Sequence, residues 1–96
     1  MNDQQIAPIH PGEHLAEFLS DLGIDLPQAA TALHIPERRV DEIIRGACDI
    51  TADTALRLGR YFGTSASLWT TLQDKYELEL AAAAIGAEVE LIQRVA

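Results

Sequence analysis

The sequence predicts an all-α fold: a small bundle of five or six helices in one domain spanning residues 1–96. Apolar residues recur at helical intervals in several segments, and the period-two alternation of half-buried strands is absent. Glycines and capping residues lie at the ends of most of these segments. A chain of 96 residues also has no room for two independent cores.

The first two helices are expected over residues 11–22 and 26–33. Gly23 is a natural stop for the first helix, and Pro27 suits the first turn of the second. Intervals of three and four residues give the first helix one apolar face, formed by Leu15, Phe18, Leu19 and Leu22.

The third helix is expected over residues 36–45, and the fourth from Thr51, a good N-cap, to a stop at Gly63. The inward residues of the third helix are Val40, Ile43 and Ile44. The fourth helix is expected to bury Ala55, Leu56, Leu58 and Phe62.

A C-terminal helical extension is expected over about residues 65–96. Its main helix begins near Thr64 or Ser65, and Gly86 is expected to interrupt it before a weaker apolar stripe. Three interpretations of Trp69 and Tyr76 remain open: core packing, which explains their spacing to Leu68 and Leu72 most simply, a dimer seam, and an exposed partner site. The residues expected to be buried are Leu68, Trp69, Leu72 and Tyr76, and those of the stripe are Ile85, Val89, Ile92 and Val95.

The segment of about residues 26–45 predicts a helix-turn-helix. Its two helices are too short to be stable alone, and only His34-Ile35-Pro36 joins them. His34 stands where such a turn favours a left-handed backbone, and Pro36 sets the start of the next helix. The third helix would then be the element that reads DNA.

The candidate site is a DNA-binding surface. We expect Arg38 and Arg39 to reach base edges in the major groove. Polar groups at helix starts suit phosphates, which predicts that Gln28 and Thr51 hold the DNA backbone. Arg45, at the end of the third helix, is expected to hold a phosphate as well. For Glu37, Glu42 and Arg45, a DNA contact and a solvated helix face paired through Asp41 and Glu42 remain equally open.

The net charge of −8 stands against this prediction, because phosphate binding needs a basic surface. The charge is uneven, however. Residues 26–62 hold five arginines against five acids, whereas residues 1–25 hold five acids with no lysine or arginine. Residues 63–96 carry two basic residues and five acids. This pattern permits one nucleic-acid face and a separate acidic surface for a basic partner.

The sequence resembles the HigA family of antitoxins, a branch of the Xre/Cro repressor-like helix-turn-helix proteins. The matching strings are IHPGEHL, the helix-turn-helix, ITADTALRLGRYFGTS and LWTTLQDKYELELA, within residues 9 to about 80. The resemblance implies a lambda repressor-like fold and a cytoplasmic homodimer that represses its own operon by binding double-stranded operator DNA. It also implies a small basic toxin partner, a RelE-like ribonuclease that the antitoxin neutralises. The family often has basic residues after the third helix, where this chain reads Gly46-Ala47-Cys48-Asp49.

Two alternatives remain open: an orphan regulator without a toxin, and a protein-interaction module that has lost useful DNA binding. We expect no enzymatic activity, no catalytic residues, no cofactor and no metal, since His10 and His14 are better explained as solvated helix-start residues. Cys48 is expected to be a neutral loop cysteine. No apolar run could span a membrane, and the start, MNDQQIAPIHPGEH, is not expected to be a signal peptide.

Overall fold

The computed structural model describes residues 7–96. The described chain forms five helices: α1 (Pro11–Leu22), α2 (Leu26–Leu33), α3 (Glu37–Ile44), α4 (Ala52–Phe62) and α5 (Ala66–Val89). Residues 7–96 contain no strand, and the predicted all-α class is confirmed. Residues 1–6, part of the stretch expected not to be a signal peptide, lie outside the described residues.

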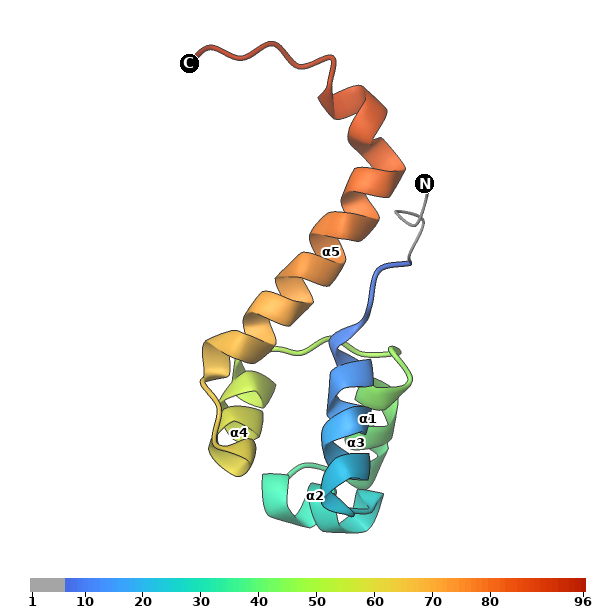
Figure 1. Ribbon diagram of the computed structural model, residues 1–96, viewed down its shortest axis with the longest axis vertical. Coiled ribbons are helices and arrows are strands. Elements are labelled where there is room, and N and C mark those ends of the chain that lie inside the picture. The colour runs from blue at the N-terminus through green and yellow to red at the C-terminus, as the bar shows by residue number, and fades with distance from the viewer. Residues whose placement is uncertain (1–6) are drawn as a thin grey trace.

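The helices form two groups that meet along the core (Figure 1). In one group α3 packs against both α1 and α2, and in the other α4 packs against α5. Contacts of α1 with α5 and of α2 with α4 join the groups. The second half of α5 projects beyond the other helices, so the molecule is 50 Å long and only 22 Å thick.

The core is closed around Trp69 of α5, which is fully buried. Its indole nitrogen donates a hydrogen bond to Thr64 Oγ1 over 3.0 Å, so the polar end of the ring is satisfied. Phe18 of α1 stacks on Phe62 of α4 at a centroid distance of 4.8 Å and joins the two groups. The other buried apolar residues are Leu15, Leu19, Ala29, Ala30, Leu33, Val40, Ile43, Ile50, Ala55 and Leu58.

The helix ends follow the predicted local signals. Gly23 and Gly63 end α1 and α4 in the left-handed conformation, with φ of 67° and 71°. Thr51 is the N-cap of α4, and its hydroxyl oxygen accepts a hydrogen bond from the amide of Thr54. These helices therefore begin and end at the residues that the local capping signals predict.

Three residues expected in the core are exposed. Leu22, the last residue of α1, is 59% exposed. Leu56 is 66% exposed, since α4 turns Ala55, Leu58 and Gly59 inward instead. Leu68 is 38% exposed because the neighbouring Trp69 takes the inward position of that turn. Helical periodicity alone does not distinguish adjacent positions at the edge of an apolar face.

The expected break at Gly86 is wrong. Helix α5 continues through this glycine to Val89. A single glycine in a helix costs only about 1 kcal/mol relative to alanine, and the alanine run before it is strongly helix-forming. The extension is therefore one helix that ends at Val89, rather than a helix followed by a separate stripe. Residues 90–96 are not helical, so Ile92 and Val95 do not belong to a helical stripe as expected.

His10 is another correction, since it is 7% exposed rather than solvated. It is the N-cap of α1, and its Nδ1 accepts a hydrogen bond from the amide of Gly12 over 2.9 Å. The ring lies edge-on to Tyr76 of α5 at 4.9 Å. His10 belongs to the packing between α1 and α5, whereas His14 is half-buried one turn later.

Candidate nucleic-acid interface

The helix-turn-helix consists of α2, the turn His34–Pro36 and α3. His34 adopts the left-handed conformation predicted for it, with φ of 60° and ψ of 41°. The amides of His34 and Ile35 turn back to the carbonyls of Thr31 and Ala30, at 3.4 and 3.2 Å, and close the end of α2. Pro36 then serves as the N-cap of α3.

Helix α3 is held from behind by α1. A Cβ atom added to Gly12 would lie only 1.8 Å from the carbonyl oxygen of Ile43, so the start of α1 touches the backbone of α3. Val40 and Ile43 are fully buried on the same side. The opposite side of α3 is free, and Glu37, Arg38 and Arg39 are exposed there.

Two ion pairs lie along the free side of α3, and both join residues four apart. Arg38 Nε lies 3.3 Å from Glu42 Oε2, and Arg45 Nε lies 2.9 Å from Asp41 Oδ2. The Arg38 side chain is 88% exposed and that of Arg45 is 59% exposed. Because exposed ion pairs add little to stability, both guanidinium groups can exchange a carboxylate for a phosphate or a base edge at small cost.

Arg39 connects this surface to the start of α4. The hydrogen bond and charge of Arg57 lower the pKa of Asp53, and the charge of Arg39 lowers it further. Arg39 therefore lies close enough to Asp53 for their charges to interact across the two helices.

Gln28 and Thr51 lie at helix starts, as predicted, but both already make local hydrogen bonds. Gln28 Oε1 accepts from the amide of Asp25, and Asp25 Oδ1 accepts from the amide of Gln28, each at 2.9 Å. This capping box fixes the Gln28 oxygen, so its NH₂ group is the part suited to a phosphate. The Thr51 hydroxyl donates to Thr54 Oγ1 over 3.2 Å.

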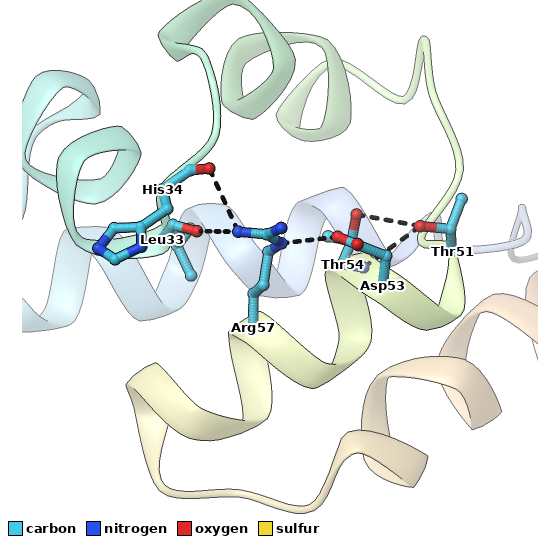
Figure 2. A network of polar contacts seen from close by, with 6 residues as sticks. All are labelled: Leu33, His34, Thr51, Asp53, Thr54 and Arg57. Atoms are coloured by element: carbon cyan, nitrogen blue, oxygen red, sulfur yellow. Dashed lines mark hydrogen bonds and ion pairs between the residues drawn. The ribbon is translucent and has the colours of Figure 1, made fainter.

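Two residues that support this surface were not singled out from the sequence. Gln73 of α5 is buried, and its Oε1 accepts from the amide of Ile50 over 2.8 Å, which anchors the loop before Thr51. Arg57 of α4 donates from Nε to Asp53 Oδ1 over 2.6 Å and from Nη1 to the carbonyls of Leu33 and His34 (Figure 2). The four-residue spacing of Asp53 and Arg57 signals their pair, but no sequence signal marks the carbonyl contacts.

Other kinds of site have little support in the described structure. Within residues 7–96, no group of three or more His, Cys, Asp or Glu side chains could hold a metal ion. Cys48 is half-buried and packs against the core. None of the described helices is long and apolar enough to cross a membrane.

A bundle in which a short helix pair presents an exposed arginine face defines a helix-turn-helix protein of the Xre/Cro type. No protein-family model matches the chain. Virulence-associated protein I of Dichelobacter nodosus is 46% identical over 78 residues, covering 80% of this chain and 72% of that protein. The chain belongs to the HigA family of antitoxins, as two solved structures show.

The first of these structures is an addiction module antidote protein of the HigA family from Coxiella burnetii. It has 45% sequence identity and a TM-score of 0.89, with 93% of this chain and 99% of that chain covered. The second is the antitoxin HigA of Pseudomonas aeruginosa with the higBA promoter. It has 44% identity and a TM-score of 0.86, with the same two shares covered. Both structures are of antitoxins rather than enzymes.

Proposed function

We propose that this chain is a DNA-binding repressor of its own operon and the antitoxin of a toxin–antitoxin pair. The observation that carries the proposal is the free side of α3, where Arg38 and Arg39 are exposed. The Pseudomonas relative, solved with its promoter, supports DNA as the ligand. Helix α3 would lie in the major groove, as in other helix-turn-helix proteins.

The predicted site residues take distinct roles in this proposal. Arg38 and Arg39 read bases, since a guanidinium can donate two hydrogen bonds to guanine. Gln28, Arg45 and Thr51 hold phosphates on either side. Glu37 and Glu42 are further candidates, because a carboxylate can accept from the amino group of cytosine.

The test is selection of bound sequences from a random duplex pool at low salt, followed by affinity measurements on the enriched sequence. The double variant R38A/R39A should lose the enrichment, because each good base contact is worth about 1 to 3 kcal/mol. The matched control is K75A/R94A, which removes the same two charges from α5 and the C-terminus and should enrich the same sequence as the native chain.

Each outcome of this selection has a clear meaning. Enrichment that survives in R38A/R39A would show that neither arginine is needed to read the DNA sequence. No enrichment by the native chain, at any salt concentration, would contradict the repressor and favour a protein-interaction module. A native chain that binds should also lose affinity steeply as salt rises.

The proposed repressor is a homodimer, and the free half of α5 supports this. Leu78, Ala82, Ile85 and Val89 recur at intervals of four, three and four residues, so they share one face of the helix. Leu78 lies nine residues after the buried Trp69, which is two and a half turns at about 100° per residue. This apolar stripe therefore points away from the core of its own chain, and a second copy can cover it.

The proposed toxin is a small basic protein, a ribonuclease of the RelE-like type. Acidic residues dominate α5 and the segment that includes α1, which suits a basic partner. The test is co-expression of the chain with the protein encoded by the adjacent reading frame. A stable complex in which ribonuclease activity is blocked is expected, and a neighbour that neither binds nor cleaves RNA would leave an orphan regulator.

A further inference from the structure

Arg57 makes the most extensive polar contacts between α4 and the helix-turn-helix (Figure 2). Its Nη1 donates to the carbonyl oxygen of Leu33 over 2.9 Å and to that of His34 over 3.2 Å. Its Nε donates to Asp53 Oδ1, one turn earlier on α4. One planar guanidinium therefore joins two carbonyls of the turn to a carboxylate of α4.

These two carbonyls need a partner from outside their own helix. The last carbonyls of any α-helix have no amide of that helix to accept from. They also carry the negative end of the helix dipole, which a cation stabilises. At the end of α2, the side chain of Arg57 supplies both the donor and the charge.

The turn that Arg57 holds determines where α3 starts. Only Ile35 and Pro36 separate His34 from the first residue of α3, and the φ angle of proline is fixed. Helix α3 packs on α1 and α2, whereas α4 packs on α5. Arg57 is thus a polar link between the helix that would read DNA and the group of helices to which α5 belongs.

The surroundings keep Arg57 charged and oriented. The hydrogen bond and charge of Asp53 raise the pKa of Arg57 above its ordinary value. The Arg57 side chain is 37% exposed, compared with 88% for Arg38 on the reading face. Its Nη1 and Nε atoms donate to the carbonyls of Leu33 and His34 and to Asp53.

We propose that Arg57 is a positioning residue for DNA recognition, which fixes α3 relative to α4 by holding the carbonyls of Leu33 and His34. It acts without touching DNA. The inference rests on the proposed function, because it concerns how the same surface reads an operator. Its loss would leave the side chains of Arg38 and Arg39 on α3 unchanged but populate incorrect orientations of that helix, in which they do not reach the bases.

The experiment compares R57M with R60M on the enriched operator duplex over a range of salt concentrations. Methionine keeps the length and apolar stem of the side chain but removes the donors. Arg60 is an exposed residue of the same helix, and the hydrogen bonds to the carbonyls of Leu33 and His34 come from Arg57 instead. If each α3 is correctly oriented about a third of the time in R57M, both α3 helices of a dimer are correct about a tenth of the time. R57M should then bind the duplex about tenfold more weakly than the native chain, whereas R60M should bind like the native chain.

The salt dependence separates positioning from a direct phosphate contact. A lost phosphate contact lowers the steepness of log affinity against log salt by about 0.9 for each copy, or about 1.8 for the dimer, whereas a positioning residue leaves the slope unchanged. Equal affinity of R57M and R60M would overturn the proposal, and so would a reduced slope in R57M. A native chain that binds no duplex would instead defeat the proposed function.

R57K provides a second test if R57M does not fold. Lysine keeps the charge, but its ammonium cannot span two carbonyls and Asp53 as the planar guanidinium does. We expect R57K to remain folded by circular dichroism and to bind DNA more weakly than the native chain. Native affinity in R57K would overturn the geometric role of Arg57, since charge alone would then be enough.

Discussion

His34 is the one non-glycine residue with positive φ in the part of the chain that the structure describes. A left-handed backbone costs an L-residue roughly 1 to 2 kcal/mol, and glycine avoids that cost. H34G should therefore stabilise the protein by about 1 kcal/mol in urea unfolding. At Gly23, where φ is 67° and an added Cβ would meet no atom within 4 Å, G23A should destabilise it by a similar amount. A loss of stability in H34G would mean that the imidazole makes a compensating contact.

Asp53 makes the stability of the protein depend on pH. Its folded-state pKa is lowered, chiefly by the hydrogen bond and charge of Arg57. The ionised carboxylate therefore stabilises the folded state above the ordinary pKa of about 4, and this contribution is lost as pH falls through the lowered pKa. D53N should be less stable than the native chain near neutral pH, and the difference should shrink in acid. Urea unfolding at both pH values measures it, and a difference independent of pH would contradict the assignment.

At the scale of elements, Gly86 has the lowest helix propensity in the half of α5 that projects beyond the other helices. A Cβ atom added there meets no atom within 4 Å, so alanine fits without a clash. G86A should favour the helix by about 1 kcal/mol, which slows amide hydrogen exchange over residues 82–89 about fivefold. A87G is the matched control and should speed exchange in the same turn. Unchanged exchange in both variants would show that this segment does not open as a helical unit.

The elements also show which parts of the candidate site could be predicted. The ends of α2, α3 and α4 and the left-handed His34 depend on residues within about four positions, so they could be read directly. Arg57 reaches carbonyls 23 and 24 positions away, and nothing in the intervening sequence encodes that approach. Gln73 could not be predicted for the same reason, because it accepts a hydrogen bond from the amide of Ile50, 23 positions away.

At the scale of the whole molecule, the apolar stripe of α5 predicts the surface that forms the dimer. I85E places a charge in this stripe, where Ile85 is 48% exposed, and should dissociate the dimer and weaken operator binding. A84E adds the same charge to the neighbouring position, about 100° away around the helix, and should leave the dimer intact. Sedimentation of both variants measures the change. A dimer that persists in I85E would place the interface elsewhere.

The sequence by itself determined the features that arise between near neighbours: the all-α class, the helix ends, the turn at His34 and the exposed arginines of α3. These depend on capping, backbone strain and helical spacing, which act over a few residues. Only the tertiary structure decided that His10 is buried, edge-on to Tyr76, and that Leu56 is exposed. It also decided that Arg57 holds the turn. The physical reason is that burial and long-range hydrogen bonds depend on which helix faces meet, and periodicity alone does not specify the meeting of faces.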